Sequence, residues 1–214
     1  MISHRRKCIF IHIPKCGGSS IEKLIWPREK DKTEANLWMG FTSEYGNKYQ
    51  TGGLQHLMAK HVRQEVGEDV FDRYYKFSLV RNPYDKAVSQ FEYMKKRPDL
   101  REFLGMSEND DFKTYLTLIA KKVHVQWDSQ YKFILDDSGN ALVDYVGRFE
   151  NFDEDVTTIL DALNMHKNIF GVRKKIPHTN KSTRKHYRDY YDDESKAMLE
   201  ALYKKDIAMF GYAF

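Results

Sequence analysis

Features that mark secreted or metal-binding proteins are scarce in this chain of 214 residues, which holds only two cysteines, Cys8 and Cys16. If the segment between them is an extended strand, it separates them by roughly 25 Å at about 3.3 Å per residue, too far for a disulfide. Their spacing also matches no zinc pattern. We therefore expect buried or incidental thiols and no bound metal.

Long apolar runs are also missing, and no stretch approaches the roughly 20 residues that a membrane helix requires. Basic residues precede an apolar run near the N-terminus, as in a signal peptide. That run is short, contains His12 and leads into a lysine–glycine loop rather than a cleavage site. We expect a soluble, cytoplasmic protein with no membrane span.

Charge of one sign is not in large excess, because the formal net charge is only +4 and acidic and basic residues are interspersed. This balance favours an anionic ligand without requiring a nucleic-acid partner, and no RRM, KH or zinc-finger pattern is present. The length suits one α/β domain, and we find no repeat or domain boundary. We expect a single domain over residues 1–214.

What the chain does have is the stretch CIFIHIPKCGGSSIEKLI, Cys8 to Ile25. The apolar run at its start is typical of a buried parallel strand, and the amphipathic segment at its end predicts a helix. Between them, Lys15 precedes two glycines and two serines, an order that presents backbone N–H groups and a helix N-terminus to a phosphate. Ser19 or Ser20 is expected to cap the helix. A Walker A loop would have its lysine directly after the last glycine. An ordinary strand-to-helix turn with a solvated lysine is the alternative.

The second informative stretch is YYKFSLVRNPYDKAVSQFEYM. Residues 76–80 predict a core strand with Arg81 at its carboxyl end, where ligands bind in open α/β sheets. Asn82 and Pro83 are good first residues for the helix that follows. Ser89 lies inside that helix. Arg81 and Ser89 predict a second phosphate clamp, or else a surface salt bridge and a helix-packing serine.

His56 is placed at the start of a helix running through LMAKHVRQEV, where the helix dipole favours a neutral imidazole able to accept a proton. His61 points to a different face of that helix. Glu150 is a candidate catalytic carboxylate, although fixing a loop or pairing with a nearby arginine is the more frequent role.

The remaining chain predicts a strand and three further helices. The strand covers 142–146, and the helices have apolar faces around 112–119, 156–163 and 199–210. The most basic stretch, 174–188, shows no strong apolar period and is interpreted as a segment that folds over phosphates, or as a solvated loop. The C-terminal tail FGYAF is expected to pack against the body.

Taken together, IFIHIPKCGGSS and FSLVRNPYDKAVSQF resemble the two phosphate-binding signatures of the carbohydrate sulfotransferase family, type 2-like. VGRFENF, HTNKST and KKDIAMFGYAF are similar to segments of its bacterial members. The resemblance implies a P-loop-type three-layer α/β fold with a central parallel sheet flanked by helices. It also implies an enzyme that uses 3′-phosphoadenosine 5′-phosphosulfate (PAPS), releases PAP and requires no metal.

The resemblance also assigns roles. Lys15 with Gly17, Gly18, Ser19 and Ser20 would surround the 5′-phosphosulfate, with Lys15 stabilising the leaving phosphate. The Cys16 position commonly carries threonine in relatives, so a backbone contact would survive there and a hydroxyl contact would not. His56 lies where related enzymes place a histidine base. The 3′-phosphate would be held by Arg81 and Ser89, and the late basic segment would contribute Ser182 and Arg184.

The implied reaction is in-line sulfuryl transfer to an acceptor hydroxyl, of a glycan or glycolipid by resemblance, limited by positioning and charge stabilisation. Two other functions stay open from the residues. A P-loop kinase of a nucleotide or small metabolite would use Mg²⁺-ATP. A nucleotide-binding module without turnover would bind the nucleotide and transfer nothing.

Overall fold

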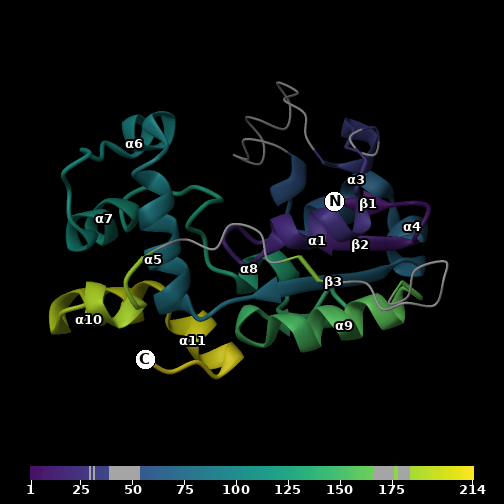
Figure 1. Cartoon of the computed structure of the whole chain (residues 1–214). Coiled ribbons are helices and arrows are strands. Elements are labelled where there is room, and N and C mark those ends of the chain that lie inside the picture. The colour runs from purple at the N-terminus through teal and green to yellow at the C-terminus, as the bar shows by residue number, and fades with distance from the viewer. Residues whose placement is uncertain (29, 31, 39–53, 166–175, 178–183) are drawn as a thin grey trace. The chain divides into compact units, whose positions relative to one another are not determined.

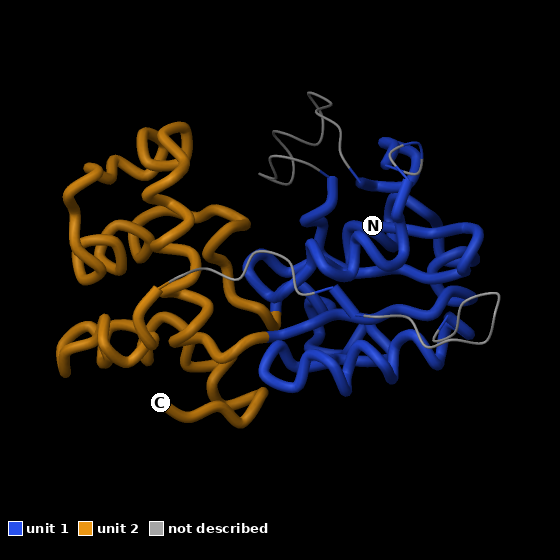
Figure 2. Tube along the Cα trace, viewed as in Figure 1, with its two compact units in different colours: residues 1–80, 132–181 blue, residues 81–131, 182–214 orange. Residues whose placement is uncertain are grey.

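The computed structural model describes residues 1–28, 30, 32–38, 54–165, 176–177 and 184–214. These residues form two compact units, coloured separately in Figure 2. Unit 1 comprises residues 1–80 and 132–181, and unit 2 comprises residues 81–131 and 182–214. Each unit is therefore built from two separate stretches of the chain.

Unit 1 is an α/β layer structure around one sheet (Figure 1), with strand order β1-β2-β3-β4. Strands β2, β3 and β4 are parallel, and β1 adds an antiparallel edge. The predicted α/β fold with a parallel sheet flanked by helices is thus confirmed, with one antiparallel strand that the sequence patterns did not indicate. Its elements are β1 (Ile2–Ser3), β2 (Cys8–Ile11), α1 (Gly18–Ile25), α3 (Ala59–Val66), α4 (Glu68–Arg73), β3 (Tyr75–Val80), β4 (Tyr145–Arg148) and α9 (Phe152–Ala162), with short 3₁₀ turns at Glu34–Asn36, Leu54–His56 and Phe149–Asn151.

Burial on both faces explains why the central strands are nearly continuous apolar runs. All four residues of β2 are buried, and Phe10 stacks on Phe77 of β3 with ring centroids 5.1 Å apart. Ser78 of β3 is fully buried and donates its hydroxyl to the Ile11 carbonyl at 2.7 Å. The sheet core is therefore apolar where the predicted strands lie, and its buried hydroxyl is satisfied. Cys8 and Cys16 are both buried free thiols, as expected.

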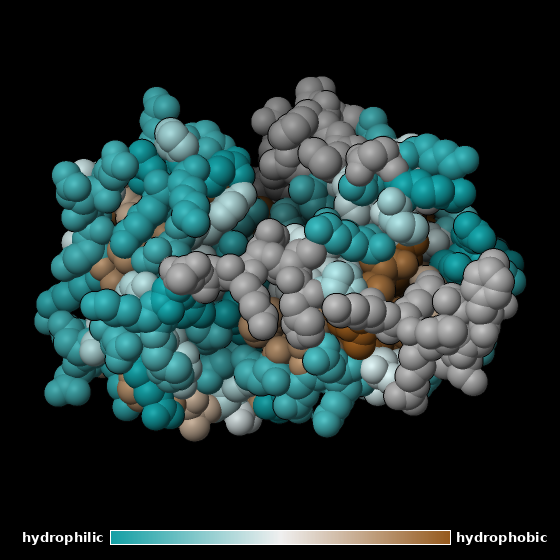
Figure 3. Space-filling view, viewed as in Figure 1, coloured by the Kyte–Doolittle hydropathy of each residue, from teal (hydrophilic) through white to brown (hydrophobic). Residues whose placement is uncertain are grey.

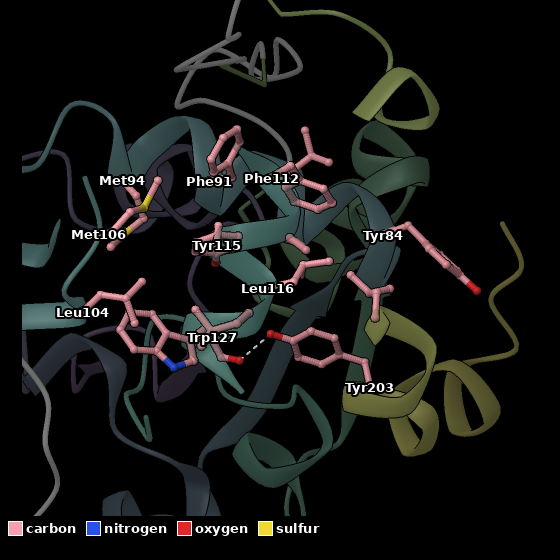
Figure 4. Packing of buried hydrophobic residues seen from close by; sticks show 14 residues of the cluster. Tyr84, Phe91, Met94, Leu104, Met106, Phe112, Tyr115, Leu116, Trp127 and Tyr203 are labelled. Atoms are coloured by element: carbon pink, nitrogen blue, oxygen red, sulfur yellow. Dashed lines mark hydrogen bonds between the residues drawn. The ribbon is translucent and has the colours of Figure 1, made fainter. Parts of the chain in front are cut away.

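Unit 2 is helical. Its elements are α5 (Pro83–Met94), α6 (Pro98–Leu104), α7 (Phe112–Ile119), α10 (Asp193–Leu202), α11 (Lys204–Phe210) and a 3₁₀ turn at Tyr187–Tyr190. The short helix α8 (Tyr131–Ile134) leads back to unit 1. Figure 4 shows the aromatic-rich core of unit 2, in which the Tyr203 hydroxyl donates to the Trp127 carbonyl at 2.6 Å. Because this donor is satisfied, the ring can be buried at little polar cost.

Three boundaries differ from the predictions. The third parallel strand begins at Tyr145 rather than at 142. The last predicted helix is two helices, because the backbone leaves helical geometry at Tyr203 between α10 and α11. The loop helix α1 has Gly17 as its N-cap without a side-chain hydrogen bond, so Ser19 and Ser20 lie inside the first turn and do not cap it.

The surface shown in Figure 3 is mostly hydrophilic over the described residues, in keeping with 31% charged residues in the sequence. No helix within the described part of the chain combines the length and the apolar character needed to cross a bilayer.

Candidate active site

The loop between β2 and α1 contains two residues in the left-handed backbone region, Lys15 with φ 66° and Gly17 with φ 85°. Left-handed geometry is costly for lysine, and such strain is concentrated at functional sites. The N-cap Gly17 offers no side-chain acceptor to the first-turn N–H groups, and no acidic residue lies in that turn. The positive end of α1 is therefore suited to an external anion.

Space around the two glycines is closed by specific side chains. A Cβ on Gly17 would lie 2.8 Å from Phe152 and 3.0 Å from Phe149, whereas one on Gly18 would lie 1.9 Å from Nε2 of His12. Phe149 and Phe152 of the VGRFENF stretch thus pack against the loop. Both positions accept only glycine, which fits a loop whose backbone must approach a ligand.

Gly18→Ala is expected to destabilise the protein by about 1–3 kcal/mol, because the new methyl group and the His12 ring cannot occupy the same space. Chemical denaturation of the wild-type protein and of the variant measures the loss. His12→Ala in the Gly18→Ala background should recover part of the stability. Purely additive effects in this double-mutant cycle would contradict the contact.

His56 lies at the end of the 3₁₀ turn Leu54–His56, whereas α3 begins only at Ala59. The expectation that a helix dipole keeps this histidine neutral is therefore wrong. A hydrogen bond fixes the ring instead, because Nδ1 lies 3.0 Å from the backbone carbonyl oxygen of His12. A carbonyl oxygen only accepts, so Nδ1 carries the proton and Nε2 of the neutral ring is the basic nitrogen.

His56 and the glycine loop are brought together by His12. The rings of His12 and His56 have centroids 4.6 Å apart, and the His12 ring also lies against Gly18. His12 is 8% exposed and stacks on Phe10 of β2. Sequence reasoning noted His12 only as an interruption of an apolar run, and the alternation of side chains along β2 was the signal that could have placed it beside Phe10. The other candidate bases are His61 on α3 and the exposed Glu150 in the 3₁₀ turn Phe149–Asn151.

In unit 2 the predicted residues Arg81 and Arg184 share one carboxylate. Arg81 donates Nη2 at 2.6 Å and Nε at 2.9 Å to Oδ2 of Asp85, and Arg184 donates to its Oδ1. Burial alone would raise the pKa of Asp85, but the guanidinium groups of Arg81 and Arg184 hold it below its usual value. Asp85 therefore stays ionised and fixes two arginines beside each other, leaving a net positive cluster.

Ser89 is half-buried on α5, four residues after Asp85 and thus one turn along the same helix face. The predicted cap is confirmed, since the Asn82 side chain accepts from the N–H of Tyr84. Arg184 also lines an open groove of about 690 Å³ in unit 2. Arg81 and Arg184 are thus held together at the start of α5, and Ser89 lies further along the same helix. Ser182 lies outside the described residues.

The backbone of Arg81 is held by residues that sequence reasoning missed. The Gln130 side chain accepts from the N–H of Arg81 and donates to its carbonyl, both at 2.8 Å. The buried Asp206 in turn accepts from the N–H groups of Gln130 and Tyr131, at 2.8 Å and 2.9 Å. Burial raises the pKa of Asp206, and these N–H groups oppose that rise. The KKDIAMFGYAF segment therefore helps to hold the backbone of Arg81 in place, because its Asp206 binds Gln130 and Gln130 binds Arg81.

Asp206→Ala is expected to lower the free energy of unfolding by about 2–4 kcal/mol, because it leaves the buried N–H of Gln130 and the part-buried N–H of Tyr131 without an acceptor. Asp193 is the matched control, an exposed aspartate in the first turn of α10. Its replacement by alanine should cost no more than about 1 kcal/mol. Equal losses in the two variants, measured by urea denaturation, would contradict the role given to Asp206.

Among the described residues, no group of three or more histidine, cysteine, aspartate or glutamate side chains is arranged to hold a metal ion.

An uncharacterized protein of Archaeoglobus fulgidus is 25% identical to this chain over 104 residues, which are 49% of this chain and 79% of that protein. No solved structure matches the chain. A family model described as the sulfotransferase family matches residues 1–213, so both units fall within one match. With an α/β sheet, a glycine loop at its first parallel strand and a family match over nearly its whole length, the chain belongs to the sulfotransferase family.

Proposed function

We propose that this protein transfers the sulfuryl group of PAPS to a hydroxyl group of a carbohydrate acceptor, such as a glycan or glycolipid. The observation that carries the proposal is His56, whose Nδ1 proton is held by the His12 carbonyl beside the glycine loop. This arrangement leaves Nε2 to accept a proton next to an anion-binding loop. A kinase that positions phosphates would more commonly have a Walker-type lysine after the glycines.

The loop of unit 1 would hold the 5′-phosphosulfate. Backbone N–H groups from Gly17 to Ser19 and the positive end of α1 would bind the anion, and Cys16 would contribute through its backbone. Ser20 would contribute its hydroxyl, because its N–H already donates to the Gly17 carbonyl at 3.0 Å. Negative charge grows on the departing phosphate oxygen as the sulfuryl group leaves. The ammonium group of Lys15 would stabilise that charge, as positioned cations do in related transfer reactions.

His56 would act as the general base. The acceptor hydroxyl loses its proton to Nε2 while its oxygen attacks sulfur, and the resulting imidazolium is stabilised by the Nδ1–H bond to the His12 carbonyl. The donor supplies the activated sulfuryl group, and the protein supplies position and charge. No step of this reaction uses a metal ion.

Arg81, Ser89 and Arg184 of unit 2 would bind the 3′-phosphate, together with Ser182. The support is the shared contact of Arg81 and Arg184 with Asp85 and the position of Ser89 one turn further along α5. Two guanidinium groups and one hydroxyl suit a phosphate, since arginine presents paired donors to it.

Calorimetric titration with PAP and with adenosine 5′-phosphate, which lacks the 3′-phosphate, tests this assignment. Arg81→Ala should weaken the binding of PAP at least about 10-fold, which is the effect of losing a charge-assisted hydrogen-bonded pair. The affinity for adenosine 5′-phosphate should stay nearly unchanged. Lys15→Ala should weaken both ligands. Equal weakening of both ligands by Arg81→Ala would contradict the 3′-phosphate assignment.

The activity itself is tested by incubating the protein with ³⁵S-labelled PAPS and a panel of glycan and glycolipid acceptors. Labelled product that requires the protein and appears without added Mg²⁺ supports the proposal. Phosphoryl transfer from Mg²⁺-ATP would identify a kinase instead. PAP binding without transfer to any hydroxyl acceptor would identify a nucleotide-binding module.

A further inference from the structure

We propose that Asp85 is a positioning residue of the 3′-phosphate site, and that it aligns Arg81 and Arg184 so that both guanidinium groups reach the phosphate. The inference rests on the proposed function, because it assumes that these two arginines bind the 3′-phosphate. It gives a role in nucleotide binding to a carboxylate, a group that repels a phosphate when its charge alone is considered.

The carboxylate of Asp85 divides its two oxygens between the two arginines. Oδ2 accepts from Nε and Nη2 of Arg81 at 2.9 Å and 2.6 Å, and Oδ1 accepts from Nη2 of Arg184. One small planar group therefore sets the spacing of two guanidinium groups from distant parts of the chain. A guanidinium group has five N–H donors, so an arginine that is held by a carboxylate can bind a phosphate as well.

The position of Arg184 depends on Asp85 more than that of Arg81 does. Arg81 is also fixed through its backbone, because the Gln130 side chain binds its N–H and its carbonyl. The other acceptor of Arg184 is the backbone carbonyl of the next residue, Lys185, at 3.4 Å. Over the residues that the structure describes, Asp85 is thus the only side chain that accepts a hydrogen bond from Arg184. Without Asp85, this guanidinium group would lose its link to α5.

The three side chains are largely removed from water. Side-chain exposure is 9% for Arg81, 10% for Arg184 and 18% for Asp85. Two guanidinium groups in such surroundings repel each other strongly, and the carboxylate between them offsets that repulsion. The pair of arginines is therefore assembled before a ligand arrives, so that binding does not have to order them.

A purely structural role for Asp85 predicts a different result. Asp85 lies in the first turn of α5, where a negative charge stabilises a helix through its dipole. Loss of that role would lower stability without a selective loss of nucleotide affinity. Loss of a negative charge beside a phosphate would by itself tighten binding, whereas loss of alignment weakens it. The direction of the change in PAP affinity therefore separates positioning from charge.

Calorimetric titration of Asp85→Asn with PAP and with adenosine 5′-phosphate tests the inference. The variant should bind PAP at least about 10-fold more weakly, as expected when charge-assisted contacts are lost, and adenosine 5′-phosphate nearly as the wild type does. Asp85→Glu keeps the charge but displaces the carboxylate, so its PAP affinity should lie between those of Asp85→Asn and the wild type. Asp99→Asn is the matched control, because Asp99 also lies in the first turn of a helix and pairs with an arginine, Arg97. Both affinities should be unchanged in that variant.

Unchanged or tighter binding of PAP by Asp85→Asn would overturn the inference, and so would equal weakening of both nucleotides. If Asp85→Asn does not fold, Asp85→Glu replaces it, and wild-type PAP affinity in Asp85→Glu would then overturn the inference. A wild-type protein that binds PAP no more tightly than adenosine 5′-phosphate would instead overturn the 3′-phosphate assignment in the proposed function.

Discussion

His56→Ala is expected to lower kcat for sulfuryl transfer about 10²–10⁴-fold, the usual contribution of a positioned general base. The side chain makes its hydrogen bond to a backbone carbonyl that remains in the variant, and its 3₁₀ turn is anchored by the buried Leu54. Thermal unfolding should therefore change little. PAP affinity should also change little, because the loop that holds the phosphate is intact.

The measurement is steady-state transfer of ³⁵S from labelled PAPS as a function of pH. Wild-type kcat/KM should fall on the acidic side as the base becomes protonated, and this limb should disappear in His56→Ala. His61→Ala is the control, since His61 is the neighbouring histidine of the chain and lies half-buried on α3. Full activity in His56→Ala, or a larger loss in His61→Ala, would remove the base assignment.

Lys15→Ala is expected to reduce kcat about 10²–10³-fold, comparable to the loss of one group that stabilises charge in a transition state. The loss should appear in kcat as well as in PAP affinity, because the charge on the leaving oxygen is largest at the transition state. Alanine adopts the left-handed backbone of Lys15 no more easily than lysine does, so the substitution does not relieve the loop's backbone strain.

Lys7→Ala is a matched control at the other end of β2. Lys7 is also a lysine with positive φ, at 49°, and its exposed side chain lies in the turn before β2. Lys7→Ala therefore removes the same charge under the same backbone constraint, but at a position outside the phosphate loop. Similar losses of activity in the two variants would show that general charge, and not the position of Lys15, is responsible.

The phosphate loop could be predicted because its parts are local. An apolar strand, two glycines and an amphipathic helix are adjacent in the chain, and each has a strong pattern. The helix after Arg81 was predictable for the same reason, since Asn82 and Pro83 specify its start. The short edge strand β1 gave no such signal, because two residues are too few for any period.

What the sequence could not reveal are contacts between residues far apart in the chain. His56 takes its tautomer from a carbonyl 44 residues away, and Asp206 reaches Gln130 across 76 residues. Nothing in the local pattern of either segment encodes such a pairing. The dipole argument for His56 failed for this reason, since it assumed that the nearest helix would determine the ring's environment.

The break between α10 and α11 has a similar origin. The apolar period continues through Leu199, Tyr203 and Phe210, so the pattern predicts one helix. The Tyr203 hydroxyl is instead bound to the Trp127 carbonyl, and Asp206 is bound to backbone N–H groups after Trp127. These two polar contacts position the second helix, and a hydrophobic period carries no information about them.

The most direct test of the central claim is a crystal structure of the protein with PAP bound. The claim predicts the 5′-phosphate within hydrogen-bonding distance of the backbone N–H groups from Gly17 to Ser19, with the ammonium group of Lys15 on the same phosphate. A nucleotide bound with its phosphates elsewhere, and this loop without an anion, would contradict it.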